Sequence, residues 1–183
     1  MNVDESWTTQ GSTTHKAPSG VVKEGDYTGA PLLVGGKIRR WPTLVIEIGR
    51  SQPLESLRMV MGLWFRESED AVEMVVLVKL CRDDHSILVE KYTEGPVAVQ
   101  RPGATTTRSA RGGLAPVLRQ RVTIREVAGR PLEYKVSGAP LVLEFNLLFL
   151  RQPDLAIGER DIVVDEHGLQ RAAAPTWAEY GDE

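Results

Sequence analysis

A single carboxylate interrupts an otherwise apolar strand pattern in the first third of the chain. Glu47 lies within Leu44–Ile48, a run whose β-branched residues are typical of a strand. Its neighbours place apolar side chains on both faces, which predicts a largely buried sheet where an unpaired carboxylate would be costly. We therefore expect Glu47 either to pair with a nearby basic side chain or to share a cation with Asp26. The basic candidates are Arg50, Arg58 and Lys79.

Both carboxylates also have a purely structural interpretation. A salt-bridged Glu47 would be an ordinary buried strand residue, and Asp26 beside Gly25 fits a turn carboxylate equally well. The two form a metal site only if their oxygens converge within direct or water-bridged distance of one cation. The arrangement of these two carboxylates in the structure therefore bears on whether they form a metal site or have separate structural roles.

A second group with chemical potential is a set of arginines in a segment rich in Gly, Pro and Thr, from about 94 to 115. It contains Arg101, Arg108 and Arg111. Arginine can bind phosphate through two parallel hydrogen bonds, and an adaptable backbone can follow the shape of a polyanion. The segment predicts a nucleic-acid contact or, alternatively, a solvated loop.

Composition narrows the remaining classes of function. The net charge is −3, so the chain has no overall positive field to attract a polyanion and nucleic-acid binding must be local. Cys81 is the only cysteine, which excludes an internal disulfide and favours a reducing compartment for the protein. Because it ends an apolar strand pattern, Cys81 is expected to be a small core residue. His15 is expected to be solvated. No apolar run is long enough for a membrane span or a signal core, so we expect an intracellular protein, cytoplasmic or nuclear.

The elements that would position these residues predict one mixed α/β (α+β) domain over residues 21–173. Residues 1–20 are expected to be a flexible tail and residues 174–183 an acidic C-terminal tail. Apolar residues at helical spacing predict a helix over about 53–67, and Val72–Leu80 with Ser86–Tyr92 predicts a β-hairpin.

Three further segments complete the predicted elements. The alternation in Val117–Val127 is typical of an edge strand, and residues 141–150 fit a strand that runs into a helical turn. Residues 161–164 predict a last short strand, followed by a helix over 166–173. The expected architecture is a mixed sheet of about five strands with one principal helix packed on it.

The order of these motifs resembles the core of PD-(D/E)XK nuclease-like proteins, which have a restriction endonuclease-like fold. The matching residues are Lys23-Glu24-Gly25-Asp26, then Trp41–Gly49, then Ser51, followed by the helix, the Val-rich strand and the hairpin strand that ends Glu90-Lys91-Tyr92. In small bacterial members the first motif is a Pro-Asp pair, and here Gly25 stands in the place of the proline. The resemblance covers about residues 20–170. It is closer still to uncharacterised fungal proteins that also carry a segment like Gly138–Phe145.

The resemblance implies a catalytic site for phosphodiester hydrolysis. Asp26 and Glu47 would hold Mg²⁺, which polarises phosphoryl oxygens and lowers the pKa of an attacking water. A lysine two residues after the second carboxylate normally completes such a site, but this position is Gly49. Arg58 on the following helix and Lys79 on the next strand are candidate substitutes, as is the adjacent Arg50.

Three functions therefore remain open from the sequence. The first is a divalent-metal-dependent nuclease with a degenerate active site. The second is a catalytically inactive module of the same fold that binds nucleic acid, through Arg101, Arg108 and Arg111, or that binds a protein partner. The third is a protein with a purely structural role, for which no cofactor is needed.

Overall fold

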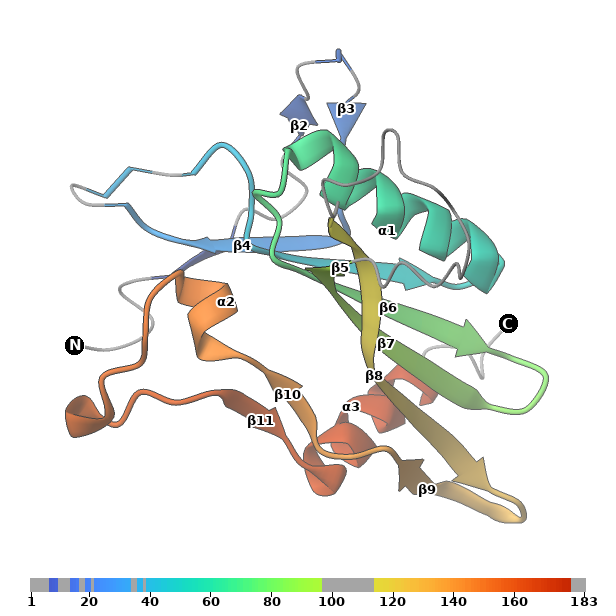
Figure 1. Cartoon of the computed structure of the whole chain (residues 1–183). Coiled ribbons are helices and arrows are strands. Elements are labelled where there is room, and N and C mark those ends of the chain that lie inside the picture. The colour runs from blue at the N-terminus through green and yellow to red at the C-terminus, as the bar shows by residue number, and fades with distance from the viewer. Residues whose placement is uncertain are drawn as a thin grey trace, which may run out of the picture.

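The computed structural model describes residues 7–9, 14–16, 19–20, 22–33, 36–37, 39–96 and 114–178 (Figure 1). In this part of the chain, one seven-stranded sheet has the spatial order β1-β4-β5-β6-β7-β8-β9. Its strands are β1 (Trp7–Thr9), β4 (Tyr27–Pro31), β5 (Leu44–Gly49), β6 (Met74–Cys81), β7 (Ser86–Pro96), β8 (Leu114–Val127) and β9 (Arg130–Ser137). Strands β5 and β6 are parallel, whereas the other neighbours are antiparallel. The mixed α/β class is confirmed, but the expected count of about five strands is wrong.

The additional strands lie where the sequence pattern is short or irregular. Strand β1 falls within residues 1–20, the predicted tail, and pairs with β4. Strand β2 (His15–Lys16) falls there too and pairs with β3 (Val22–Lys23). His15 is buried, not solvated as expected, because its ring stacks on Trp41 and its Nδ1 atom is hydrogen-bonded to the carbonyl oxygen of Arg40.

Helix α1 (Leu54–Ser68) confirms the predicted helix and covers one face of the sheet. Pro53, whose φ of −60° suits the entry to a helix, precedes it, and Glu55 lies favourably in the first turn. The apolar stripe packs on β5 and β6 as part of a cluster that contains Val45, Leu57, Met61, Trp64, Phe65 and Val75. Because α1 connects two parallel strands, it crosses over the face of the sheet towards which Glu47 points.

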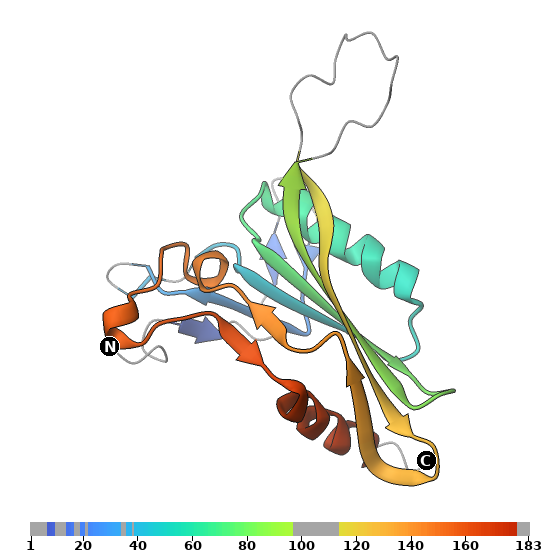
Figure 2. The same cartoon turned by 60° about the horizontal axis from the view of Figure 1, so that its bottom comes forward.

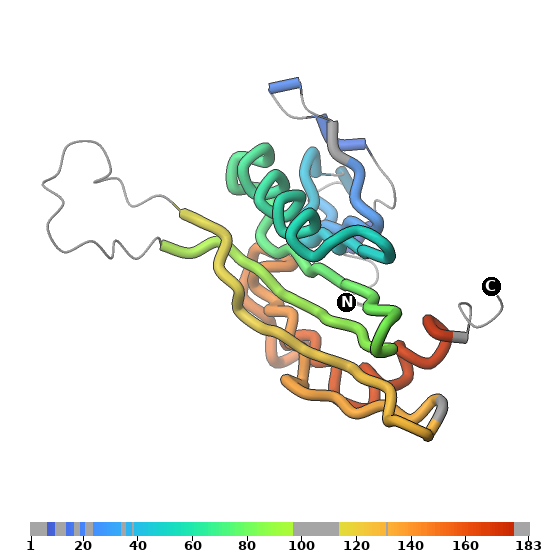
Figure 3. The backbone as a smooth tube through the Cα atoms, turned by 90° about the vertical axis from the view of Figure 1, so that its right-hand side faces the viewer, coloured from blue at the N-terminus to red at the C-terminus, as the bar shows by residue number. Residues whose placement is uncertain are grey.

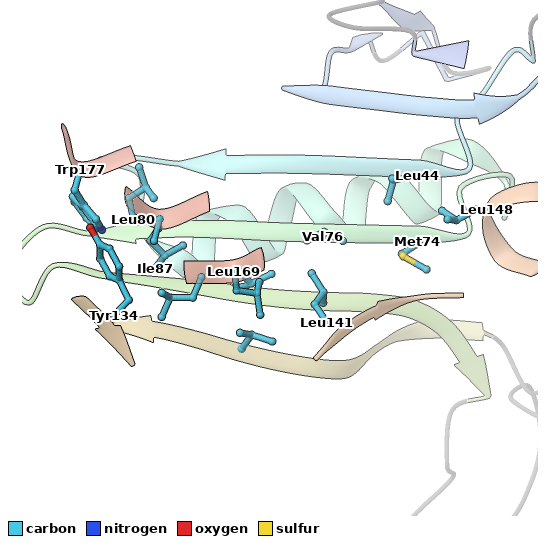
Figure 4. Packing of buried hydrophobic residues seen from close by; sticks show 14 of the residues in the cluster. Leu44, Met74, Val76, Leu80, Ile87, Tyr134, Leu141, Leu148, Leu169 and Trp177 are labelled. Atoms are coloured by element: carbon cyan, nitrogen blue, oxygen red, sulfur yellow. The ribbon is translucent and has the colours of Figure 1, made fainter. Parts of the chain in front are cut away.

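The opposite face carries the larger apolar cluster and the C-terminal elements (Figure 2). Strands β10 (Leu141–Leu143) and β11 (Ile162–Val164) pair with each other, and α2 (Phe145–Phe149) and η2 (Leu155–Ile157) lie between them in the chain. This confirms the strand running into a helical turn and the last short strand. Figure 4 shows Leu141 and Leu169 over the side chains of the sheet.

Helix α3 (Glu166–Ala178) contacts β8 and β9 on this second face. The tube in Figure 3 shows α1 and α3 on opposite sides of the sheet. The helix is longer than the predicted 166–173 and continues through Pro175. Trp177 explains the extension, because it packs in the cluster that Figure 4 shows and stacks on His85 with ring centroids 5.3 Å apart. Within the described residues, no helix is both long and apolar enough to cross a membrane.

Candidate functional site

The register of β4 and β5 brings Asp26 and Glu47 to neighbouring positions. Tyr27 pairs with Ile46, so the next position along each strand is Asp26 opposite Glu47. Tyr27 and Ile46 pack on the second face, and alternation therefore directs the two acidic residues towards α1. Asp26 is exposed, and its Oδ2 atom accepts a hydrogen bond of 2.6 Å from the backbone nitrogen of Ile48. Asp26 and Glu47 therefore lie at neighbouring register positions on the same face of the sheet, and each carboxylate has its own hydrogen-bond donor.

Glu47 is buried, and it accepts a hydrogen bond from a residue that the sequence did not indicate as its partner. The indole Nε1 of Trp64 donates a hydrogen bond of 2.5 Å to Oε1 of Glu47, whose residue is only 8 % exposed. Trp64 is itself fully buried, with its ring edge-on to Trp41 at a centroid distance of 6.1 Å. The bond orients the carboxylate from the helix side, as hydrogen bonds to ligating carboxylates do in metal sites.

Gly25 stands where the resemblance implies a proline, and the packing around it leaves little room. A Cβ atom at Gly25 would lie 2.9 Å from Cγ2 of Thr28, whereas its distance of 3.4 Å from Cζ2 of Trp64 is an ordinary contact. A proline ring there would need still more room. The restriction therefore comes mainly from Thr28 of β4.

Gly49 stands where the resemblance implies a lysine, and the packing around it is tight. A Cβ atom at Gly49 would lie 2.5 Å from Cδ1 and 3.1 Å from Cγ of Leu57, a fully packed residue of α1. The space that a lysine stem would occupy is filled by helix side chains. A lysine at this position is therefore incompatible with the present packing of α1.

This steric conflict predicts the effect of a small substitution. We expect Gly49→Ala to lower the free energy of unfolding by about 1–3 kcal/mol, the usual cost of forcing an extra methyl group into a packed core. Gly62→Ala is the matched control, because nothing lies within 4 Å of its added Cβ. In the interior of α1 it should raise stability by up to about 1 kcal/mol. Urea unfolding of both variants measures the two effects. Equal stabilities for Gly49→Ala and the wild type would contradict the steric overlap between a Cβ atom at position 49 and Leu57.

The basic residues proposed to replace the missing lysine are held by other groups. Lys79 Nζ donates a hydrogen bond of 2.6 Å to the carbonyl oxygen of Arg50. Arg58 donates to both oxygens of Glu90, at 3.0 and 2.7 Å, and to Oε1 of Glu55 at 2.6 Å. The structure thus places Arg58 and Lys79 on the same face as Glu47, but it engages each of them elsewhere.

Glu90 is the centre of a charged network that sequence reasoning missed. Its side chain is completely buried, and it accepts hydrogen bonds from Arg58, from the hydroxyl of Tyr92 at 2.7 Å and from Arg121 at 3.0 and 2.7 Å. Burial alone would raise the pKa of Glu90, but the hydrogen bonds from Arg58, Tyr92 and Arg121 outweigh it and lower the pKa to about 2. Glu90 is therefore ionised at neutral pH and holds two guanidinium groups in fixed positions.

Part of this network could have been predicted from the sequence as a pair of opposite charges on neighbouring strands. Glu90 lies opposite Leu77 on one side and opposite Arg121 on the other. An acidic residue in one predicted strand and a basic residue in the next is the pattern of a cross-strand pair. The sequence does not show the contribution of Arg58, because it depends on how the helix crosses the sheet.

Basic side chains extend from this network over the part of the face that α1 leaves uncovered. Val122 and Ile124 point into the second-face cluster, so Arg121 and Arg125 lie on the α1 side. Arg125 pairs in register with Lys135 of β9, and both are exposed. We call Arg121, Arg125 and Lys135 the basic face. A shallow cavity of about 550 Å³ lies beside it, lined by Thr123, Arg125, Glu126, Val127, Lys135 and Ser137.

The other residues predicted to contact nucleic acid, Arg101, Arg108 and Arg111, lie outside the described residues. Among the residues that are described, no group of three or more His, Cys, Asp or Glu side chains has an arrangement able to hold a metal ion. No protein-family model matches the sequence, and no curated protein is similar to it at a significant level.

Proposed function

We propose that this chain is a PD-(D/E)XK nuclease-like protein with a degenerate active site, which binds the phosphodiester backbone of nucleic acid through its basic face. Three features support the family assignment. Asp26, just before β4, neighbours Glu47 of β5; the helix α1 follows β5; and α1 leads to a parallel strand, β6. This is the order of elements that the resemblance implies.

The main support for a degenerate active site is the lack of space for a side chain at Gly49. A lysine two residues after Glu47 would orient the attacking water, and Leu57 fills the space that its stem would need. Lys79 and Arg58 are bound to Arg50 and Glu90 instead. A positive charge that is fixed in a second interaction stabilises the developing charge of a transition state only if that interaction is given up.

The remaining donor set is compatible with a divalent cation. Asp26 and Glu47 are hard oxygen ligands of the kind that Mg²⁺ binds, and Mg²⁺ often uses only one or two carboxylates together with water and phosphate. When bound, Mg²⁺ would supply Lewis-acid polarisation of a phosphoryl oxygen. Trp64 would keep the Glu47 carboxylate oriented, since its hydrogen bond fixes Oε1. Cation binding without efficient hydrolysis is the behaviour that we propose.

A hydrolysis assay tests the degenerate site. Purified protein with Mg²⁺ or Mn²⁺ should degrade labelled DNA and RNA no faster than Glu47→Ala, because the group that orients water is missing. Asp26→Asn serves as a second control, since Asp26 is exposed and its loss should disturb the fold least. Cleavage that depends on metal and disappears in both variants would contradict degeneracy and would assign a working nuclease to the same site.

Binding through the basic face rests on charge and exposure. Arg125 and Lys135 are exposed at adjacent register positions, and Glu90 holds Arg121 beside them. Arg125 also pairs with Asp84 at 2.8 Å, an exposed ion pair that a phosphate can replace at little cost. Groups arranged in this way can displace counterions from a phosphate backbone even though the net charge of the whole chain is −3. Binding of nucleic acid to the basic face therefore does not depend on the Asp26 and Glu47 carboxylates.

A further inference from the structure

An apolar cavity of about 350 Å³ lies on the face of the sheet opposite α1. Its floor is formed by aliphatic side chains of β5 to β8, including Ile46, Ile48 and Val78, and its wall by α3. The helix presents Ala172 and Ala173 towards this space, so no large side chain fills it. Ile48 remains 44 % exposed, which leaves the cavity open at β5.

The apolar surface continues along β5 beyond this cavity. Ile46 also lines a second cavity of about 330 Å³, whose other walls include Trp7, Tyr27 and Phe149. Leu44 lies at the far end of the same strand and lines the second cavity as well. From Arg50 to Leu44 the strand spans about 20 Å at 3.3 Å per residue. Because Ile46 lines both cavities, they adjoin along β5. We call the two together the apolar groove, whose length suits an extended alkyl chain.

One end of this groove carries positive charge. Of the fourteen described residues that line the first cavity, Arg50 is the only ionisable one, and Thr176 is the only other polar one. Lys79, whose ammonium group binds the backbone oxygen of Arg50, lies on the α1 face of the sheet and does not line this cavity. No acidic side chain is among the described lining residues of either cavity. A ligand that matches this lining has an apolar chain and one terminal anion.

We propose that this groove binds a free fatty acid, with its carboxylate at Arg50 and its alkyl chain along β5 towards Phe149. Apolar pockets with a few polar groups at one end are the usual form of small-molecule sites, and their volumes begin near 300 Å³. The alkyl chain gains from removal of its surface from water, and the carboxylate gains from the guanidinium group of Arg50 at the rim. This site is on the other face of the sheet and does not depend on the nuclease-like assignment.

Calorimetric titration with dodecanoate, below the concentration at which it forms micelles, tests the proposal. We expect saturable binding at one site. Hexanoate should bind at least ~100-fold more weakly, because each methylene group removed from water contributes about 0.8 kcal/mol. Absence of dodecanoate binding, or equal binding of the two chain lengths, would overturn the proposal.

Two variants test the position of the ligand. Ala172→Leu places a larger side chain in the cavity wall and should weaken dodecanoate binding about tenfold or more, whereas Ala156→Leu, an exposed site in η2, should not. Arg50→Gln should weaken dodecanoate about threefold and leave dodecanol unchanged, because only the carboxylate meets the guanidinium. Arg66→Gln is the charge-matched control on α1. Unchanged binding by Ala172→Leu, or an equal loss for acid and alcohol in Arg50→Gln, would overturn the assigned site.

Discussion

Glu90→Gln is expected to lower the free energy of unfolding by about 3 kcal/mol at neutral pH, in the range measured when one partner of a buried ion pair is removed. Arg58 and Arg121 retain 28 % and 52 % of their side-chain exposure, so both can turn partly to water, which limits the loss. Glu55→Gln is the matched control. Glu55 is 78 % exposed and pairs with the same Arg58, and its loss should cost under about 1 kcal/mol.

The effect of Glu90 should depend on pH in a defined direction. The pKa of Glu90 is lowered to about 2 from 4.5, so its contribution is fully present above about pH 4.5 and is lost as the pH falls towards 2. Burial and a hydrogen bond with Asp70 raise the pKa of Glu94 to about 7. The contribution of Glu94 to stability is therefore lost as the pH rises through about 7, and this loss is the same in the wild type and in Glu90→Gln. The difference between wild type and Glu90→Gln in urea unfolding should therefore narrow below pH 4.5. A difference in free energy of unfolding that does not change with pH, or that is no larger than the effect of Glu55→Gln, would contradict a stabilising role for the ionised Glu90.

Trp64→Ala is expected to cost about 3–5 kcal/mol, the usual range for removing a fully buried aromatic residue. The side chain packs against Trp41 and His15, with ring centroids 6.1 and 5.8 Å away, and it supplies the hydrogen bond to Glu47. Urea unfolding measures the loss. The variant removes packing and a hydrogen bond together, so a second variant is needed to separate them.

Trp64→Phe keeps an aromatic ring but removes the donor together with part of the buried indole. It should cost about 1–3 kcal/mol, because a buried carboxylate loses a hydrogen bond. In a Glu47→Ala background, the same change should cost clearly less, since no carboxylate remains to be satisfied. Equal costs in the two backgrounds would contradict the hydrogen bond as the interaction that orients Glu47.

The central elements of the fold could be predicted because their patterns are strong. The β-branched run at Leu44–Gly49, the helical stripe that includes Trp64, and the hairpin of β6 and β7 all lie where expected. Each combines a clear period with flanking turn residues. These elements position Glu47, whereas Asp26 precedes β4, a strand that the sequence pattern did not predict.

The outer strands could not be predicted in the same way. Strand β9 begins with Arg-Pro-Leu, where Leu132 has a φ of +67°, and this irregularity hides the strand pattern that follows. The polar alternation of β8 was interpreted as an edge, but β9 pairs with its second half. The exposed face of β8 instead arises because α1 contacts β5 and β6. A polar face in a strand pattern shows exposure of that face, and it does not show which strand lies beside it.

The site was predicted in part. The sequence identified Glu47 as buried and in need of a partner, but Trp64 falls on the apolar stripe of α1, a position that indicates a core residue and not a hydrogen-bond donor. The anchoring of Arg58 by Glu90 depends on a contact between residues 32 positions apart. Interactions between a helix and the sheet beneath it follow from the crossing geometry, which periodicity does not specify.

Salt-dependent binding to nucleic acid, measured with labelled DNA and RNA in the presence of a chelator, tests the central claim most directly. The wild type should bind at low salt, and log K should fall steeply with log salt. Arg125→Gln/Lys135→Gln should make this slope shallower by about 2, because each cationic side chain that binds a phosphate adds about 1 to it. Arg160→Gln/Arg171→Gln, a double variant of equal charge at exposed positions away from the basic face, should leave the slope unchanged. No binding at low salt, a flat salt response, or the same change in both double variants would contradict the account.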